Sequence, residues 1–273
     1  MGIPLVFSVK PAYRCRRLRD NRLAGWSDTA RPKFNATCFP RAPKALPDGV
    51  ELSVARSTPE FRAAGYLRAS CFYEYPPDRS EFAARTHRRM RGDMEWEAIE
   101  NKVAGRETGY ENNSVTCLLA TLPAGTDATA AALQRELDPT CLLPQDAGGD
   151  ASPRFVVGSL DINQGVKLPA EELVGRSPGR QDGDPRTARA YLSNVCTASA
   201  VRRMGIAAAL IEMACAHARA EGVSDLYVHV AALNGPAHRL YAEVAGFELE
   251  AEETESTARR LGRARRLLLH KPL

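Results

Sequence analysis

The sequence predicts a mixed α/β domain that follows a basic N-terminal segment. From residue 50 onward, runs with the two-residue alternation of strands are interspersed with runs that have the apolar spacing of helices. After residue 189 the predicted order is strand, helix, strand, helix, strand, which is typical of a sheet covered by helices. With 273 residues, 44% of them hydrophobic, the chain can build one sizeable core. We therefore expect one folded domain over residues 49–273.

Residues 1–48 form a basic leader. The first 50 residues contain ten Lys or Arg and three Asp, a charge of +7, which leaves −3 for the rest of the chain. An Arg-rich, acid-poor segment without an apolar secretory core is typical of an organellar transit peptide, plastid or mitochondrial. An ordinary disordered basic tail is the alternative. Because the domain itself is slightly acidic, we expect no nucleic-acid partner.

The composition also argues against several classes of site. The chain has no run of about eighteen apolar residues, so we expect no membrane span. The seven cysteines are scattered and odd in number, which indicates neither a disulfide framework nor a zinc site, and no metal is expected. The sequence does not indicate the oligomeric state.

Two helices follow the first predicted strand. Alternating apolar residues over 50–56 predict that strand. Thr58 followed by Pro59 predicts a helix start, with Thr58 as the N-cap. A second, highly charged helix is predicted over residues 80–104. Its apolar stripe is loosely helical in spacing and comprises Phe82, Thr86, Met90, Trp96, Ile99 and Val103.

Two apolar runs in the middle of the chain, SVTCLLATL (114–122) and RFVVGSLDI (154–162), predict the next two strands. The segment between them, residues 123–152, is rich in Ala, Gly and Asp and contains one predicted helix over 128–137. So long a connection is typical of an insertion or a functional element. A second polar loop is predicted over residues 169–187.

The C-terminal third alternates strands and helices. The strand RAYLSNVCTA is followed by a helix over residues 205–221, which Gly222 would end. The next strand, DLYVHVAAL, alternates so that His229 faces away from the flanking valines. Asn234 is predicted to cap a short helix, and a final strand, RRLLLHKPL, closes the domain.

The stretch VRRMGIAAAL is the strongest local motif. Arg202 and Arg203 precede Gly205, and a run of small residues then opens the predicted helix. The first turn of a helix carries unpaired N–H groups and a partial positive charge, so it binds anions such as phosphate. No Gly-Lys-Ser/Thr follows the glycine, which excludes the phosphate loop of nucleotide hydrolases. The motif therefore predicts a phosphate-bearing ligand of another kind.

Three ordered blocks over about 55 residues resemble the GNAT superfamily of acyl-CoA-dependent N-acetyltransferases. RRMGIA matches the pattern Q/R-x-x-G-x-G/A, with Ala207 where many relatives have glycine. YLSNVCTA resembles the fourth strand of that family, and NGPAHRLYAEVAGF resembles its later block, in which Asn, Ala, Leu-Tyr and Gly-Phe follow one another. GSLDINQ, AYLSNVC, YVHV and RLLL recur in this order in plastid GNAT enzymes of plants, which acetylate protein N-termini and lysines. The resemblance covers most of residues 50–273.

The resemblance implies a GNAT fold, with a mixed central sheet, flanking helices, and fourth and fifth strands that splay apart. It also implies acetyl-CoA as the co-substrate. The pyrophosphate would lie on the N–H groups from Arg203 to Ala208, and the pantetheine would bond the fourth strand like an added strand. Asn234 would contact the coenzyme in addition to capping its helix. The residues implied for binding are Val195, Cys196, Thr197, Arg202, Arg203, Met204, Gly205, Ile206, Ala207, Ala208, Asn234, Gly235, Pro236 and Tyr241.

The resemblance also implies two catalytic residues. Tyr241 would protonate the departing thiolate of coenzyme A, and its alternative role is that of a core aromatic residue against Phe247. His229 would act as the base for the amine, and its alternative role is that of a strand histidine bonded to a neighbour or lying beside Tyr227. Cys196 is expected to act through its backbone and not as a nucleophile.

The leading hypothesis is a plastid protein N-acetyltransferase that acts on N-terminal α-amines and also on lysine ε-amines. Its partners would be protein or peptide amines, with no nucleic acid and no membrane span. A small-amine acetyltransferase, for an arylalkylamine or a polyamine, is the alternative enzyme, because the long loops could shape either a peptide groove or a closed pocket. A non-catalytic acyl-CoA-binding regulator is the alternative from a different class, although it would need neither Tyr241 nor His229. The mitochondrion is the alternative location.

Overall fold

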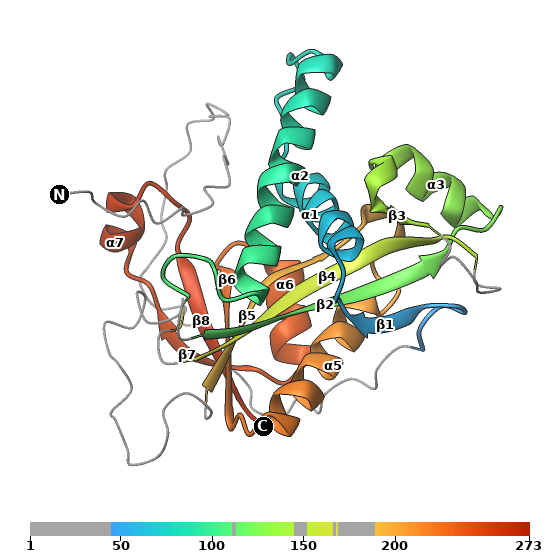
Figure 1. Ribbon diagram of the computed structural model, residues 1–273. Helices are drawn as coiled ribbons and strands as arrows, with labels where there is room; N and C mark the ends of the chain where they lie inside the picture. The colour runs from blue at the N-terminus through green and yellow to red at the C-terminus, as the bar shows by residue number, and fades with distance from the viewer. Residues whose placement is uncertain (1–44, 111–112, 145–151, 166–167, 169–188) are drawn as a thin grey trace.

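The computed structural model describes residues 45–110, 113–144, 152–165, 168 and 189–273. These residues form an eight-stranded sheet with helices on both faces (Figure 1). The mixed α/β architecture is therefore confirmed. Most of the basic leader and the polar loop predicted at 169–187 lie outside the described residues.

The strands follow the order β1-β2-β4-β5-β6-β8-β7 across the sheet, and β3 pairs with β4 beside this path. Neighbouring strands are antiparallel, except that β5 and β6 are parallel. The longest strands, β2 and β4, lie toward the middle and are buried along nearly their whole length. The bounds are β1 (Glu51–Val54), β2 (Asn113–Pro123), β3 (Leu142–Leu143), β4 (Arg154–Gly165), β5 (Arg189–Thr197), β6 (Asp225–Ala231), β7 (Glu248–Glu252) and β8 (Arg266–Pro272).

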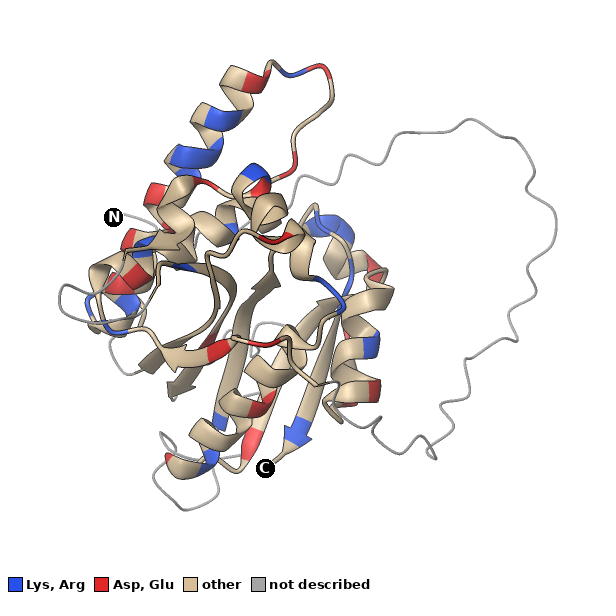
Figure 2. Cartoon of the chain, turned by 90° about the vertical axis from the view of Figure 1, so that its right-hand side faces the viewer, with Lys and Arg blue, Asp and Glu red and all other residues tan. Residues whose placement is uncertain are grey.

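The helices cover both faces of this sheet. Gly158 of β4 lies against Leu210, whereas the next residue, Ser159, accepts hydrogen bonds from Arg68. Successive residues of a strand point to opposite faces, so the helices that carry Leu210 and Arg68 lie on opposite faces. Figure 2 shows the charged residues mainly on helices and loops, with few in the middle of the sheet. The helices are α1 (Thr58–Phe72), α2 (Glu81–Val103), α3 (Ala128–Glu136), α5 (Ile206–Ala220), α6 (Gly235–Arg239) and α7 (Glu255–Arg260).

Helix α1 begins one residue earlier than the sequence predicts. Ser57 is the N-cap, and its backbone N–H donates to Oε2 of Glu60 at 2.9 Å, as in a capping box. Thr58 is the first helical residue, so the prediction of Thr58 as the N-cap is wrong. Its hydroxyl instead donates to Oε1 of Glu100 on α2. The sequence contains a competing signal, the Ser-x-x-Glu spacing from Ser57 to Glu60, which begins directly before Thr58.

Helix α2 has the predicted bounds, but its apolar stripe is only partly buried. Ser80 caps the helix by accepting from the N–H of Ala83 at 3.2 Å. Ile99 is buried, whereas Phe82 is 80% exposed and Met90 is 48% exposed. The N-terminal half of α2 projects past the sheet (Figure 1), so only its C-terminal half meets the core. Phe82 and Met90 therefore lie outside the core.

Two glycines let α1 and α2 pack closely. A Cβ atom on Gly65 would lie 2.5 Å from the backbone nitrogen of Trp96, and one on Gly92 would lie 2.8 Å from the Tyr66 ring. A larger residue at position 65 would require a helix to move, and one at position 92 would displace the Tyr66 ring. The pair therefore fixes the C-terminal half of α2 against α1, and α1 lies on β4 and β5.

Candidate active site

Strand β5 loses its parallel partner halfway along its length. It pairs with β6 from Arg189 opposite Asp225 to Leu192 opposite Val228, after which β6 continues against β8. Among the described strands, β5 pairs only with β4 beyond this point. This divergence confirms the splayed strands, which are the fifth and sixth here because β3 is an additional short strand. An open edge of this kind can accept an extended ligand as an added strand.

A β-bulge bends β5 where its open edge begins. A register shift falls between Ser159 and Asp161 of β4, so that Asn194 and Val195 of β5 lie opposite one residue. Asn194 has a φ of 56°, in the left-handed region that asparagine tolerates better than most residues. Bulges change the direction in which backbone groups point and are frequent beside active sites. Here the bulge lies at the start of the segment Val195–Thr197, which among the described strands pairs with β4 and not with β6.

The loop between β5 and α5 presents backbone N–H groups to solvent. Arg203 and Gly205 have φ of 68° and 87°, and such left-handed positions make concave nests of N–H groups that bind anions. Gly205 is the N-cap of α5 and provides no side chain to cap the first turn. Arg202 and Arg203 are exposed beside it, and Met204 is half-buried. The first-turn N–H groups, which suit a pyrophosphate, belong to Ile206, Ala207 and Ala208.

The segment between β2 and β4 supports this loop. Glu136, the last residue of α3, accepts hydrogen bonds from the N–H groups of Ser199 at 2.5 Å and Ala200 at 2.8 Å. These two residues open a 3-10 turn (Ser199–Val201). The turn leads directly into residues 202–205 before α5, which we call the anion loop. The predicted helix inside residues 123–152 is therefore confirmed, and its carboxylate anchors the entry to the loop.

The short helix α6 follows β6 on the other side of the opening. Oδ1 of Asn234 accepts from the N–H of Ala237 at 3.2 Å, so Asn234 is the N-cap, with Gly235 and Pro236 in the first turn. A π-helical turn (Leu240–Val244) continues α6 and carries Tyr241. π-Helical turns are rare and frequent at functional sites. The turn therefore points to Tyr241 as a functional residue.

Tyr241 is buried and packs edge-to-face against Phe247, with 5.7 Å between ring centroids. Burial raises the pKa of its phenol above the ordinary range, and nearby Tyr191 and Cys196 raise it further. These electrostatic neighbours belong to β5, so the ring lies near the open segment of that strand. At neutral pH the residue is a neutral phenol that can donate a proton.

His229 of β6 forms a pair with Tyr191 of β5. The Tyr191 hydroxyl lies 2.9 Å from Nδ1 of His229, and the two rings are 5.4 Å apart in an edge-on arrangement. Nε2 of His229 is buried, and among the described residues no group forms a hydrogen bond with it. If Nδ1–H donates to Tyr191, the lone pair of Nε2 is free to accept a proton.

The surroundings hold both members of this pair neutral. Burial, together with the positive charges of Arg266 and Arg263, lowers the pKa of His229 to about 3. Burial raises the pKa of Tyr191 to about 12. The imidazole is therefore uncharged at every physiological pH, which is the state required for accepting a proton.

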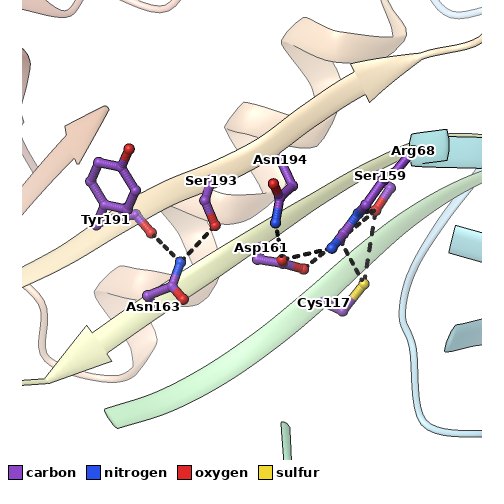
Figure 3. A network of polar contacts seen from close by, with 8 residues as sticks. All are labelled: Arg68, Cys117, Ser159, Asp161, Asn163, Tyr191, Ser193 and Asn194. Carbon is purple, nitrogen blue, oxygen red and sulfur yellow. Dashed lines mark hydrogen bonds and ion pairs between the residues drawn. The ribbon is translucent and has the colours of Figure 1, made fainter. Parts of the chain in front are cut away.

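Sequence reasoning missed Tyr191 and a polar network beneath β5. Tyr191 lies within the block YLSNVCTA, and a signal existed: both strands alternate, so Tyr191 and His229 fall on one face. The network comprises Arg68, Asp161 and Asn194, which lie close together in Figure 3 but far apart in the chain. No spacing in the sequence links Arg68 to Asp161.

The site can bind a phosphate-bearing ligand, receive an extended arm and transfer protons. The described residues contain no group of three or more side chains suited to hold a metal ion. None of the described helices has the length and apolar character needed to cross a membrane. The chemical groups that the described site offers are backbone N–H groups, one imidazole and two phenols.

The "Acetyltransferase (GNAT) family" model matches residues 129–247. GCN5-related N-acetyltransferase 7, chloroplastic, from Arabidopsis thaliana is 37% identical over 218 residues, which cover 80% of this chain and 74% of the relative. GCN5-related N-acetyltransferase 6, chloroplastic, from the same plant is 27% identical over 198 residues, which cover 70% of this chain and 58% of the relative. Among solved structures, Arabidopsis thaliana NAA60 in complex with acetyl-CoA aligns with a TM-score of 0.48 and 15% identity, over 82% of this chain and 98% of the other. The structural similarity is weak, whereas the first sequence match is extensive.

Proposed function

Since the chain belongs to the GNAT acetyltransferase family, we propose that it transfers the acetyl group of acetyl-CoA to N-terminal α-amino groups of proteins, with lysine ε-amino groups as slower acceptors. The observation that carries this proposal is the neutral Tyr191–His229 pair beside the open edge of β5. A binding module would need no such pair, whereas amine acetylation needs a group that accepts a proton.

The donor half of the proposal rests on the anion loop and on β5. Acetyl-CoA supplies the acetyl group as an activated thioester. The N–H groups of the nest at Arg203–Gly205 and of the first turn of α5 would hold its pyrophosphate. The open edge of β5 would bind its extended arm, and N–H groups there would stabilise the oxyanion that forms at the thioester carbonyl. Tyr241, as a neutral phenol, would protonate the departing thiolate.

The acceptor half follows from protonation. Only the neutral form of an amine attacks a thioester, and α-amines titrate near 7.7–8.0 while lysine titrates near 10.4. At pH 8 about half of an α-amine is free, against roughly one lysine in 250. A base whose pKa is about 3 cannot strip a strongly protonated lysine efficiently. The buried His229 therefore favours the α-amine as acceptor.

The location is proposed from the leader and from the relatives. Residues 1–48 are basic and acid-poor, and both curated relatives are named chloroplastic. We expect a fluorescent protein fused behind residues 1–50 to enter plastids in plant cells. Fluorescence in mitochondria would change the proposed location to the mitochondrion. Diffuse fluorescence in the cytosol would contradict the proposal that this segment is a transit peptide.

The test of the activity is mass spectrometry of acetylated products. The chain is incubated with acetyl-CoA and two matched peptides, one with a free N-terminus and no lysine, the other with a blocked N-terminus and one lysine. Acetylation of the first peptide, faster than of the second at pH 7.5, is the expected result. Turnover of polyamines or arylalkylamines with neither peptide modified would make the protein a small-amine acetyltransferase. Acetyl-CoA binding without any turnover would make it an acyl-CoA-binding regulator.

A further inference from the structure

A buried ion pair lies directly beneath the bulge of β5. Arg68 of α1 and Asp161 of β4 are each 1% exposed, and Figure 3 shows their side chains next to each other. Nη1 of Arg68 lies 2.9 Å from Oδ2 of Asp161, and Nη2 lies 2.5 Å from Oδ1. Nη2 also donates to Ser159 Oγ at 2.9 Å. Such a pair is rarely retained for stability alone, because apolar residues of equal volume stabilise a core as well or better.

The ion pair holds the residue that forms the bulge. The side-chain amide of Asn194 donates to Oδ2 of Asp161 at 2.9 Å, the same oxygen that Arg68 contacts through Nη1. Asn194 is also the residue with the left-handed φ of 56°. Arg68 contacts both carboxylate oxygens of Asp161. Asp161 in turn holds the side chain of Asn194, the residue at the bend.

A second contact from α1 fixes the other end of the bend. Cys71, one turn after Arg68, lies with its Sγ 3.4 Å from the carbonyl oxygen of Thr197. Helix α1 therefore contacts the segment Asn194–Thr197 at both ends, through Asp161 at the first and directly at the last. Between these ends lie Val195 and Cys196.

We propose that Arg68 and Asp161 are positioning residues, which hold the β5 bulge through Asn194 so that the backbone of Val195–Thr197 is fixed before the thioester binds. The inference rests on the proposed function. Donors aimed in advance at the developing oxyanion lower the barrier, because no reorganisation is needed during the reaction. An enzyme with a loosely held bulge would still bind the coenzyme through the anion loop. The loss of activity would therefore appear in kcat more than in KM.

The decisive variant is Asn194→Gly. Glycine adopts the left-handed conformation freely, so the backbone bend remains possible while the link to Asp161 is lost. We expect kcat to fall about tenfold and KM for acetyl-CoA to change less than about threefold. The matched control is Thr121→Val, which removes a side-chain hydrogen bond from Arg154 elsewhere on the same sheet. That control should lower the melting temperature without changing kcat.

A double-mutant cycle separates positioning from general destabilisation. If Asp161 acts through Asn194, then Asp161→Asn combined with Asn194→Gly should reduce kcat no more than the stronger single variant does. If the two losses of kcat multiply in the double variant, the inference is overturned. An Asn194→Gly enzyme whose kcat lies within twofold of the parent would also overturn it.

Hydrogen exchange tests the same link without turnover. In Asn194→Gly the amides of Val195, Cys196 and Thr197 should exchange faster than in the parent, while those of β2 should not. A parent chain that acetylates no amine would overturn the proposed function, and the exchange measurement would still decide the inference. Unchanged exchange at these three amides would overturn it.

Discussion

The two sides of β5 offer different kinds of chemical group. The loop that leads into α5 offers backbone N–H groups, which depend on two left-handed residues and on the absence of a capping side chain. The face toward α1 offers side chains, namely Tyr191 with His229 and the network around Asp161. Binding by backbone tolerates most changes of side chain, whereas proton transfer and positioning depend on individual atoms. Substitutions on the two sides should therefore change different kinetic constants.

The largest effect is expected on the backbone side, from Gly205→Glu. The change strains a residue whose φ is 87° and places a negative charge beside the phosphates. We expect kcat/KM for acetyl-CoA to fall at least about a hundredfold, with most of the loss in binding measured by calorimetry. The control is Gly222→Glu, which imposes the same strain at the other end of α5, where φ is 77°. Unchanged affinity in Gly205→Glu would remove the phosphate-loop assignment.

The next effect is expected at Tyr241→Phe, which keeps the buried ring and removes only the hydroxyl. Turnover should fall about thirtyfold with acetyl-CoA affinity nearly unchanged, because the thiolate then leaves without its acid. Tyr66→Phe is the matched control, since it also removes a phenol, whose hydroxyl donates to Asp93 of α2. Equal turnover in Tyr241→Phe and the parent would reduce Tyr241 to a packing partner of Phe247.

A smaller, pH-dependent effect is expected at His229→Ala. Because the pKa of His229 is about 3, its own titration should not appear between pH 6 and 9, and the parent rate should rise with pH as the acceptor amine deprotonates. If His229 accepts the proton, the loss should be about tenfold near pH 6.5 and shrink toward pH 9. Because so weak a base assists a lysine little, the loss should be smaller for a lysine peptide than for an α-amine peptide.

The partner variant Tyr191→Phe tests the pair in the same pH–rate series. Removing the hydroxyl frees Nδ1 and weakens the preference for a lone pair on Nε2, so the pH dependence should resemble that of His229→Ala. A loss that is independent of pH in both variants would indicate positioning and not base catalysis.

The smallest effect is expected from Glu136→Ala, again on the backbone side. The 3-10 turn would lose its anchor at Ser199 and Ala200. Removing a negative charge near the phosphates acts in the opposite direction, so KM for acetyl-CoA should rise only about threefold, with kcat unchanged. Glu212→Ala, on the exposed side of α5, should leave both constants unchanged. A fall in kcat would mean that the turn serves catalysis.

This contrast also explains what the sequence could predict. The anion loop is contiguous, so its glycine, arginines and small residues appear together within ten residues. Asn234, Pro236 and Tyr241 could likewise be proposed together, because they lie within eight residues around α6 and the turn that continues it. The interval from Arg68 to Asp161 is 93 residues, and the link between them exists only after α1 has packed on β4. Local chemistry can be read from a sequence, and contacts made by folding cannot.

The fold errors have the same origin. The bounds of α2 were predicted correctly because its cap is local, whereas the exposure of Phe82 and Met90 cannot be read from their helical spacing, since it depends on what packs beside them. The Thr58 error arose from choosing between two adjacent capping residues, where the Ser57–Glu60 pair decides. The polar loop at 169–187 lies outside the described residues, so its role stays a prediction.

The short parallel contact between β5 and β6 divides the sheet into two leaves. In the part of the sheet that the structure describes, four residue pairs, from Arg189 to Leu192, join the leaf that ends in β5 to the leaf that begins with β6. This seam is the natural line along which the sheet would part under heat or force, since so few hydrogen bonds cross it. A coenzyme arm laid along β5 would lengthen the seam and couple the two leaves. Coenzyme binding should therefore slow hydrogen exchange in β6 and β8 as well as in the loop that holds the phosphates. A ligand bound along β5 would in this way reduce the motion of the strands on the other side of the seam.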